Sequence, residues 1–66
     1  MPNVVIDGPF IEEVDTKRIL VEEITDALEK AYGFPRSAYV VTINEHPPEN
    51  VGVGGELLCD RRHGDE

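Results

Sequence analysis

The fold of this chain depends on residues 15–33, which read DTKRILVEEITDALEKAYG. Apolar residues recur there at spacings of three and four, which is typical of one face of an α-helix: Leu20, Ile24, Ala27, Leu28 and Ala31. The remaining positions are mostly charged. We therefore expect an amphipathic helix that begins with Asp15 or Thr16 as its N-cap. Gly33 should end the helix in a left-handed conformation, with Pro35 preventing its resumption.

A short strand is expected on each side of this helix. Residues 3–7 (NVVID) and residues 37–44 (SAYVVTIN) are rich in β-branched and aromatic types, which favour strands. In the second strand the alternation of side chains places Tyr39, Val41 and Ile43 on one face. A strand, a helix and a strand in succession form a crossover unit, so the two strands should be parallel.

The C-terminal third is expected to contain a loop and a hairpin. Residues 45–50 (EHPPEN) form the loop, because two consecutive prolines do not suit a sheet interior. Three glycines in residues 51–58 (VGVGGELL) permit a tight hairpin. A phosphate-binding loop is disfavoured, since neither a Lys-Ser/Thr pair nor a helix follows. The sequence predicts one domain over residues 1–66, in which residues 60–66 are a frayed, charged tail.

The small size of the chain predicts a partner. A 66-residue chain buries only about 60% of its unfolded surface, which leaves it marginally stable alone. Cys59 is the single cysteine and cannot form an internal disulfide. Two parallel strands and one helix also leave a sheet face uncovered, whereas parallel sheets are covered on both faces. We therefore expect a homo-oligomer.

The composition argues against several classes of function. The formal net charge is −8, with 14 acidic and 6 basic residues, which disfavours nucleic acid and anionic membranes as partners. No secretory signal pattern and no apolar run of about 18 residues is present, so a cytoplasmic protein is expected. One cysteine and two histidines lack the spacing of zinc ligands, so neither a metal nor another cofactor is predicted.

Pro2 is the main candidate for chemistry. An initiator methionine before a small residue is usually removed, which would leave Pro2 with a free secondary amine. Internal prolines have no N–H and no titratable nitrogen, whereas a terminal amine is a base near neutral pH. The alternative is that Pro2 is only the second residue of a frayed terminus.

Three further residues are candidates for binding an anionic ligand. Arg36 directly precedes the second strand, and the Tyr39 hydroxyl is a possible donor if it opens on a pocket. Arg18 lies in the first helical turn, where the helix dipole disfavours cations, so its position indicates a functional reason. Structural roles in the core, at an interface or on a solvated surface are the alternatives. His46 is interpreted as an exposed loop histidine or as an acid or base.

The order and spacing of these parts resemble the 4-oxalocrotonate tautomerase family over residues 2 to about 58. The resemblance is carried by Met1-Pro2, by Asp15-Thr16-Lys17, by Pro35 and Ser37, by Glu45, and by residues 52–57 (GVGGEL). It implies an α+β fold, a β-α-β tautomerase unit with a short C-terminal hairpin. It further implies that dimerisation and higher oligomerisation complete the sheet, usually as a hexamer that is a trimer of dimers.

The resemblance also implies a chemistry. The expected activity is that of a tautomerase or isomerase that moves a proton within a small enol or unsaturated 2-oxo acid, with Pro2 as general base once Met1 is gone. Related proline-dependent decarboxylation, hydration or dehalogenation is one alternative. A non-enzymatic oligomeric scaffold is the other.

The chain departs from the family where the substrate is bound. Two arginines that bind substrate carboxylates in the family fall at Glu12 and Val40, and the pocket aromatic falls at Val51. We therefore expect other residues to bind a small, anionic substrate: Arg36, Tyr39 and Arg18, with Val51 lining the pocket.

Overall fold

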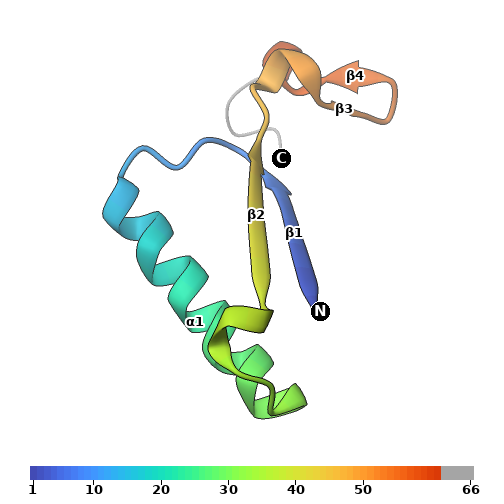
Figure 1. The fold of residues 1–66 in the computed structure, drawn as a ribbon. Coiled ribbons are helices and arrows are strands. Elements are labelled where there is room, and N and C mark those ends of the chain that lie inside the picture. Colours follow the sequence, from blue (N-terminus) through green and yellow to red (C-terminus); the bar gives the residue numbers. More distant parts are fainter. Residues whose placement is uncertain (62–66) are drawn as a thin grey trace.

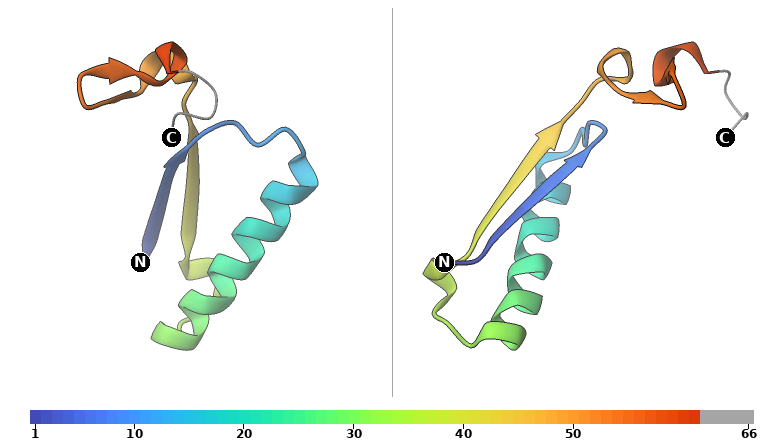
Figure 2. Two further views of the ribbon diagram at one scale, coloured as in Figure 1. Left: turned by 180° about the vertical axis from the view of Figure 1, so that it is seen from behind. Right: turned by 90° about the vertical axis from the view of Figure 1, so that its right-hand side faces the viewer.

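The computed structural model describes residues 1–61 and contains a β-α-β unit followed by a small hairpin (Figure 1). Its elements are β1 (Asn3–Gly8), α1 (Val14–Tyr32), η1 (Arg36–Ala38), β2 (Val40–Glu45), η2 (Pro48–Asn50), β3 (Gly52–Val53), β4 (Glu56–Leu57) and η3 (Leu58–Asp60), where η marks a 3₁₀ turn. The strands β1 and β2 pair in parallel from Asn3 opposite Val40 to Gly8 opposite Glu45. The hairpin of β3 and β4 lies beyond the carboxyl ends of β1 and β2 (Figure 2). The predicted strand–helix–strand order and hairpin are thus confirmed.

The start of α1 differs from the prediction. Its N-cap is Glu13, whose side chain makes no capping hydrogen bond, and both predicted caps lie inside the first turn. The carbonyl of Glu13 accepts the N–H of Thr16 at 3.1 Å. Asp15 forms an ion pair with Arg18 instead of capping the helix. This pair places a carboxylate at the positive end of the helix dipole and offsets the charge of Arg18.

The end of α1 agrees with the prediction, but β2 starts later than expected. Gly33 has a φ of 76° and donates its N–H to Glu29 O at 2.8 Å. The first residues of the predicted second strand form η1, closed by the N–H of Ala38 on the carbonyl of Pro35 at 2.9 Å. The ladder starts only at Val40 because β1 itself starts at Asn3, so residues 37–39 have no strand beside them.

The helix covers one face of the sheet and leaves the other open (Figures 1 and 2). Half-buried and exposed side chains alternate along both strands, with Val4, Ile6, Val41 and Ile43 on the covered face. The same alternation leaves Val5 60% exposed and Val40 41% exposed on the open face. No apolar side chain in residues 1–61 is buried, and Thr25, at 8% exposure, is the one buried residue of that range.

The inner stripe of α1 is only partly the predicted one. Leu20, Ile24 and Leu28 are half-buried against the sheet, as expected, whereas Ala27 and Ala31 are exposed. Thr25 occupies the middle of the inner face, and its hydroxyl donates to Val21 O at 2.8 Å. This bond satisfies a polar group that would otherwise be costly to bury.

The predicted charged tail, residues 60–66, is described only at its start. Asp60 lies in η3, and residues 62–66 lie outside the described residues. The turn of the hairpin has positive φ at both Gly54 and Gly55, as a two-residue type I′ turn requires. No helix in the described part of the chain is long and apolar enough to cross a membrane.

Glu45 ties the loop after β1 to the end of β2. Its Oε2 accepts the N–H of Ile11 at 2.8 Å and lies 3.0 Å from Lys17 Nζ. The Ile11 hydrogen bond and then the Lys17 contact lower the pKa of Glu45 below its ordinary value of 4.5. The carboxylate therefore links three segments of the chain: the loop, the start of α1 and the strand β2.

We predict that this link makes stability depend on pH. Because the folded-state pKa of Glu45 is lowered, its contribution is fully present above pH 4.5 and is lost as the pH falls through the lower, folded-state value. Glu45→Gln should lower the melting temperature near neutral pH, and the difference from wild type should shrink below pH 4.5. Thermal unfolding followed by circular dichroism from pH 3 to 8 measures this. Glu23→Gln, at an exposed position of α1, is the control and should show no such pH-dependent difference.

Candidate functional site

Pro2 is held at the amino end of the sheet, directly before β1. Its carbonyl accepts the N–H of Val40 at 3.1 Å. Because Asn3 lies opposite Val40 in a parallel ladder, Pro2 is level with Tyr39. Both residues are half-buried and continue the helix-covered face of their strands. The terminus is therefore fixed in position at Pro2, while Met1 is 84% exposed.

Tyr39 uses its hydroxyl within the chain. The Tyr39 Oη accepts the N–H of Phe34 at 2.8 Å and donates to the Phe34 carbonyl at 3.0 Å. Its ring also lies 6.4 Å from the ring of Tyr32, which in turn stacks on Phe34 at 5.8 Å. In the single chain, the hydroxyl thus closes the turn after α1.

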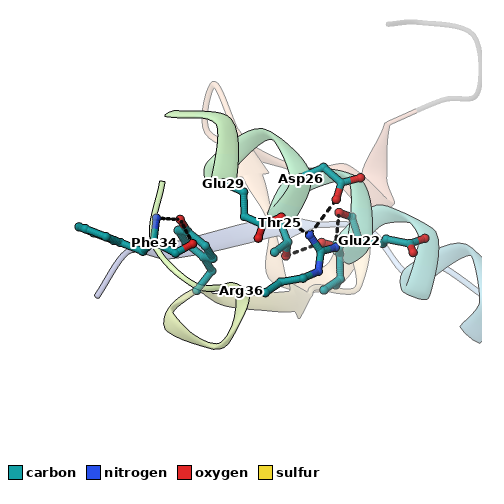
Figure 3. Close-up of polar contacts among 8 residues, drawn as sticks. Glu22, Thr25, Asp26, Glu29, Phe34 and Arg36 are labelled. Carbon is teal, nitrogen blue, oxygen red and sulfur yellow. Dashed lines mark hydrogen bonds and ion pairs between the residues drawn. The ribbon is translucent and has the colours of Figure 1, made fainter. Parts of the chain in front are cut away.

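Arg36 is likewise engaged with its own chain. Its Nη1 lies 2.8 Å from Asp26 Oδ1 and 2.6 Å from Glu29 Oε1, and its Nη2 donates to Glu22 O at 3.3 Å (Figure 3). The carboxylates of Asp26 and Glu29 raise the pKa of Arg36. Since two carboxylates offset one guanidinium charge, Arg36 tethers η1 to α1 rather than presenting a free cation.

The structure nevertheless brings three of the predicted site residues together. Arg18, Arg36 and Tyr39 line one cavity of about 510 Å³, which runs along α1 and also contacts Lys17 and Thr25. All three cations of this cavity are paired: Lys17 with Glu45, Arg18 with Asp15, and Arg36 with the two α1 carboxylates. The cavity is therefore not strongly cationic in the single chain.

Val51 lies at the opposite end of the sheet. It lines a second cavity, of about 220 Å³, beside the carboxyl ends of β1 and β2. A six-residue strand is about 20 Å long, so this cavity and Pro2 of the same chain are about that far apart. In one chain the structure does not bring Val51 to Pro2.

The second cavity contains a histidine–carboxylate pair that the sequence did not predict. His46 Nε2 lies 2.8 Å from Asp7 Oδ1, and the His46 backbone N–H donates to Gly8 O at 2.8 Å. Hydrogen bonds from His46, and then from Asn44, lower the pKa of Asp7. The parallel register could have indicated the pair, because Asp7 lies opposite Asn44 and His46 follows two residues later.

Other candidate groups offer little chemistry. Glu12 is exposed in the loop after β1, and Val40 lies on the open face of the sheet. Desolvation, followed by the charges of Asp60 and Glu49, raises the pKa of the Cys59 thiol, which makes it a poor nucleophile near neutral pH. Within residues 1–61 no three His, Cys, Asp or Glu side chains are grouped to hold a metal ion.

Comparison with protein families identifies one match. A family model described as "Tautomerase enzyme" matches residues 2–61. A curated relative, Probable tautomerase SAV1363 of Staphylococcus aureus, is 45% identical over 42 residues, which are 64% of this chain and 69% of that protein.

Solved structures of related proteins are also similar to this chain. DmpI from Archaeoglobus fulgidus is 44% identical, with a TM-score of 0.80 over 89% of this chain and all of that chain. YwhB, a homologue of 4-oxalocrotonate tautomerase, is 30% identical, with a TM-score of 0.84 over 92% of this chain and all of that chain. The β-α-β arrangement and the hairpin are thus shared with proteins of this group.

We predict that the Tyr39 hydroxyl contributes to stability. Tyr39→Phe removes two hydrogen bonds to Phe34 and should lower the free energy of unfolding by about 1 kcal/mol. Tyr32→Phe is the matched control, because the Tyr32 hydroxyl makes no hydrogen bond to residues 1–61, and should change stability much less. Urea unfolding of both variants at one protein concentration measures the difference. Equal stability of the two variants would contradict the structural role of Tyr39.

Proposed function

Because this chain belongs to the tautomerase family, we propose that it catalyses proton transfer within a small 2-oxo or unsaturated acid, with Pro2 as the general base. The observation that carries this proposal is the fixed position of Pro2. Its carbonyl is bonded to Val40, and it is half-buried beside Tyr39. A secondary amine held in this way has few conformations to lose when it meets a substrate.

The half-buried position of Pro2 supports its proposed role as a base. Burial disfavours the charged form of an amine, so an amine beside apolar strand residues releases its proton more readily than one in water. General bases work best when their pKa is close to the working pH. This requires removal of Met1, since the peptide bond to Met1 makes the Pro2 nitrogen an amide without basicity.

The proposed step transfers one proton and changes no oxidation state. The Pro2 nitrogen takes the proton of an enol hydroxyl, or one from carbon, and the electron pair of the broken bond shifts the double bond. The resulting ammonium then returns the proton to carbon at the other end of the shifted system. Neither a metal nor a cofactor is required for this transfer.

We predict that activity depends on Pro2. Conversion of the enol of a simple 2-oxo acid to its keto form, followed by absorbance, should slow at least about 100-fold in Pro2→Ala. Pro35→Ala replaces an exposed proline whose carbonyl bond to Ala38 remains available, and it should retain the rate. Intact mass must first establish that Met1 is absent. Equal rates in wild type and Pro2→Ala, both without Met1, would refute the proposal.

We also propose that the working form is a homo-oligomer. The chain has a radius of gyration of 15.5 Å, whereas a compact 66-residue domain has one of about 11 Å. The open sheet face exposes Val5 and Val40, and no described apolar side chain is buried. Further copies that cover this face would supply the missing core. A hexamer built as a trimer of dimers is the assembly that the family resemblance implies.

We predict that a charge on the open sheet face disrupts this assembly. Val5→Glu should dissociate the oligomer in analytical ultracentrifugation at micromolar concentration, because burying an unpaired carboxylate costs several kcal/mol. Thr16→Glu adds the same charge at an exposed position of the first helical turn and should leave the assembly intact. A folded wild-type monomer at this concentration would contradict the proposal.

A further inference from the structure

The cavity at the carboxyl ends of β1 and β2 combines apolar walls with one oriented imidazole. Pro9, Pro48, Val51 and Leu58 supply most of the wall, and Asp7 and His46 are the two titratable residues that line it. Small-molecule sites are typically apolar hollows with a few convergent polar groups, and in α/β units they lie beyond the carboxyl ends of the strands. The cavity has this composition and this location.

The hydrogen bonds of His46 fix the direction of its ring. Nε2 is held by Asp7 Oδ1, and the backbone N–H of the same residue is held by Gly8 O. Nδ1 makes no hydrogen bond to residues 1–61, and the His46 side chain is 40% exposed. An imidazolium ring donates through both nitrogens, so in that form a carboxylate on Nε2 leaves Nδ1–H available for an acceptor.

We propose that this cavity binds a small monocarboxylate with an apolar body, and that the imidazolium of His46 binds the carboxylate through Nδ1–H. This inference rests on the proposed function only where it identifies the bound acid as the substrate class. Binding of the acid does not require turnover. His46 thereby supplies the cation that Glu12 and Val40 do not. Because Pro2 of the same chain lies at the other end of the sheet, turnover of the bound acid would require Pro2 of another subunit.

The volume of the cavity and the charges of its lining residues determine which class of acid can bind. At about 220 Å³, the cavity is smaller than the pockets of about 300–1,000 Å³ that hold drug-sized ligands, so it admits a chain of a few carbon atoms. His46 is the one lining residue that can carry a positive charge, and the ionised Asp7 beside it repels a second carboxylate. The site should therefore prefer monocarboxylates to dicarboxylates.

The test uses three four-carbon probes on the wild-type chain. Butanoate, succinate and butanamide are titrated at pH 6 while the ring-proton NMR signals of the two histidines are recorded. A His63→Gln spectrum assigns the signals. We expect a saturable shift of the His46 signal with butanoate, and at least tenfold weaker binding of the other two probes. No saturable shift, or equal binding of butanamide, overturns the inference.

Variants separate binding from folding. His46→Gln should weaken butanoate binding at least tenfold, whereas Glu49→Gln, at an exposed neighbouring position, should not. Val51→Trp leaves both Asp7 and His46 in the sequence but fills the cavity with a large ring, and it should abolish binding. Circular dichroism establishes that each variant is folded. Undiminished binding in folded His46→Gln or in folded Val51→Trp overturns the inference.

The two proposals fail in different ways. Saturable binding at His46 without any turnover would refute the proposed function and leave the binding site intact. Pro2-dependent turnover with the same KM in wild type and His46→Gln would refute the binding site and leave the proposed function intact.

Discussion

The uncovered face of the two-stranded sheet is the constraint on which the rest of the structure depends. A parallel sheet normally has both faces covered, and this chain has a single helix to cover one of them. The covered face gathers Val4, Ile6, Val41 and Ile43, yet none of these side chains is fully buried. A chain built in this way gains too little apolar burial to balance the entropy lost on folding. The association proposed above would then be part of folding itself and not only of function.

A second constraint is the shortage of positive charge. With 6 basic and 14 acidic residues, the chain uses its few described cations to hold itself together. Lys17 ties α1 to Glu45, Arg36 ties η1 to two carboxylates of α1, and Arg18 pairs with Asp15 in the first helical turn. Surface ion pairs contribute little individually, so these contacts position segments more than they stabilise them. Within residues 1–61 each arginine is paired with a carboxylate, and His46 is the remaining basic side chain that lines a cavity.

Much of the fold was predictable from the sequence because it depends on local signals. The helical period around Leu20, Ile24 and Leu28, the left-handed Gly33 and the Gly54-Gly55 turn are each determined by neighbouring residues. The prediction for Ala27 and Ala31 was wrong because a single methyl group has little apolar area, so alanine is a weak indicator of the buried face. The predicted start of β2 was wrong because local strand propensity does not indicate where the partner strand β1 begins.

The candidate site was less predictable, since its contacts join distant residues. Arg18, Arg36 and Tyr39 line one cavity, but the ion pairs of Arg36 and the hydrogen bonds of Tyr39 depend on how the chain reverses after Gly33. The Asp7–His46 pair spans 39 positions and requires the parallel register. The role of Pro2 as a base was suggested by its position after Met1 and by the family resemblance. No local sequence pattern gives further support for this role.

The bond between the Val40 N–H and the Pro2 carbonyl also bears on how the protein matures. Val40 is synthesised about 40 residues after Pro2, which takes about 2–8 seconds at ordinary rates of translation. Until then, nothing in the ladder holds the terminus. An aminopeptidase that works during synthesis thus meets Met1 on a loose chain, before folding fixes Pro2 at the edge of the sheet.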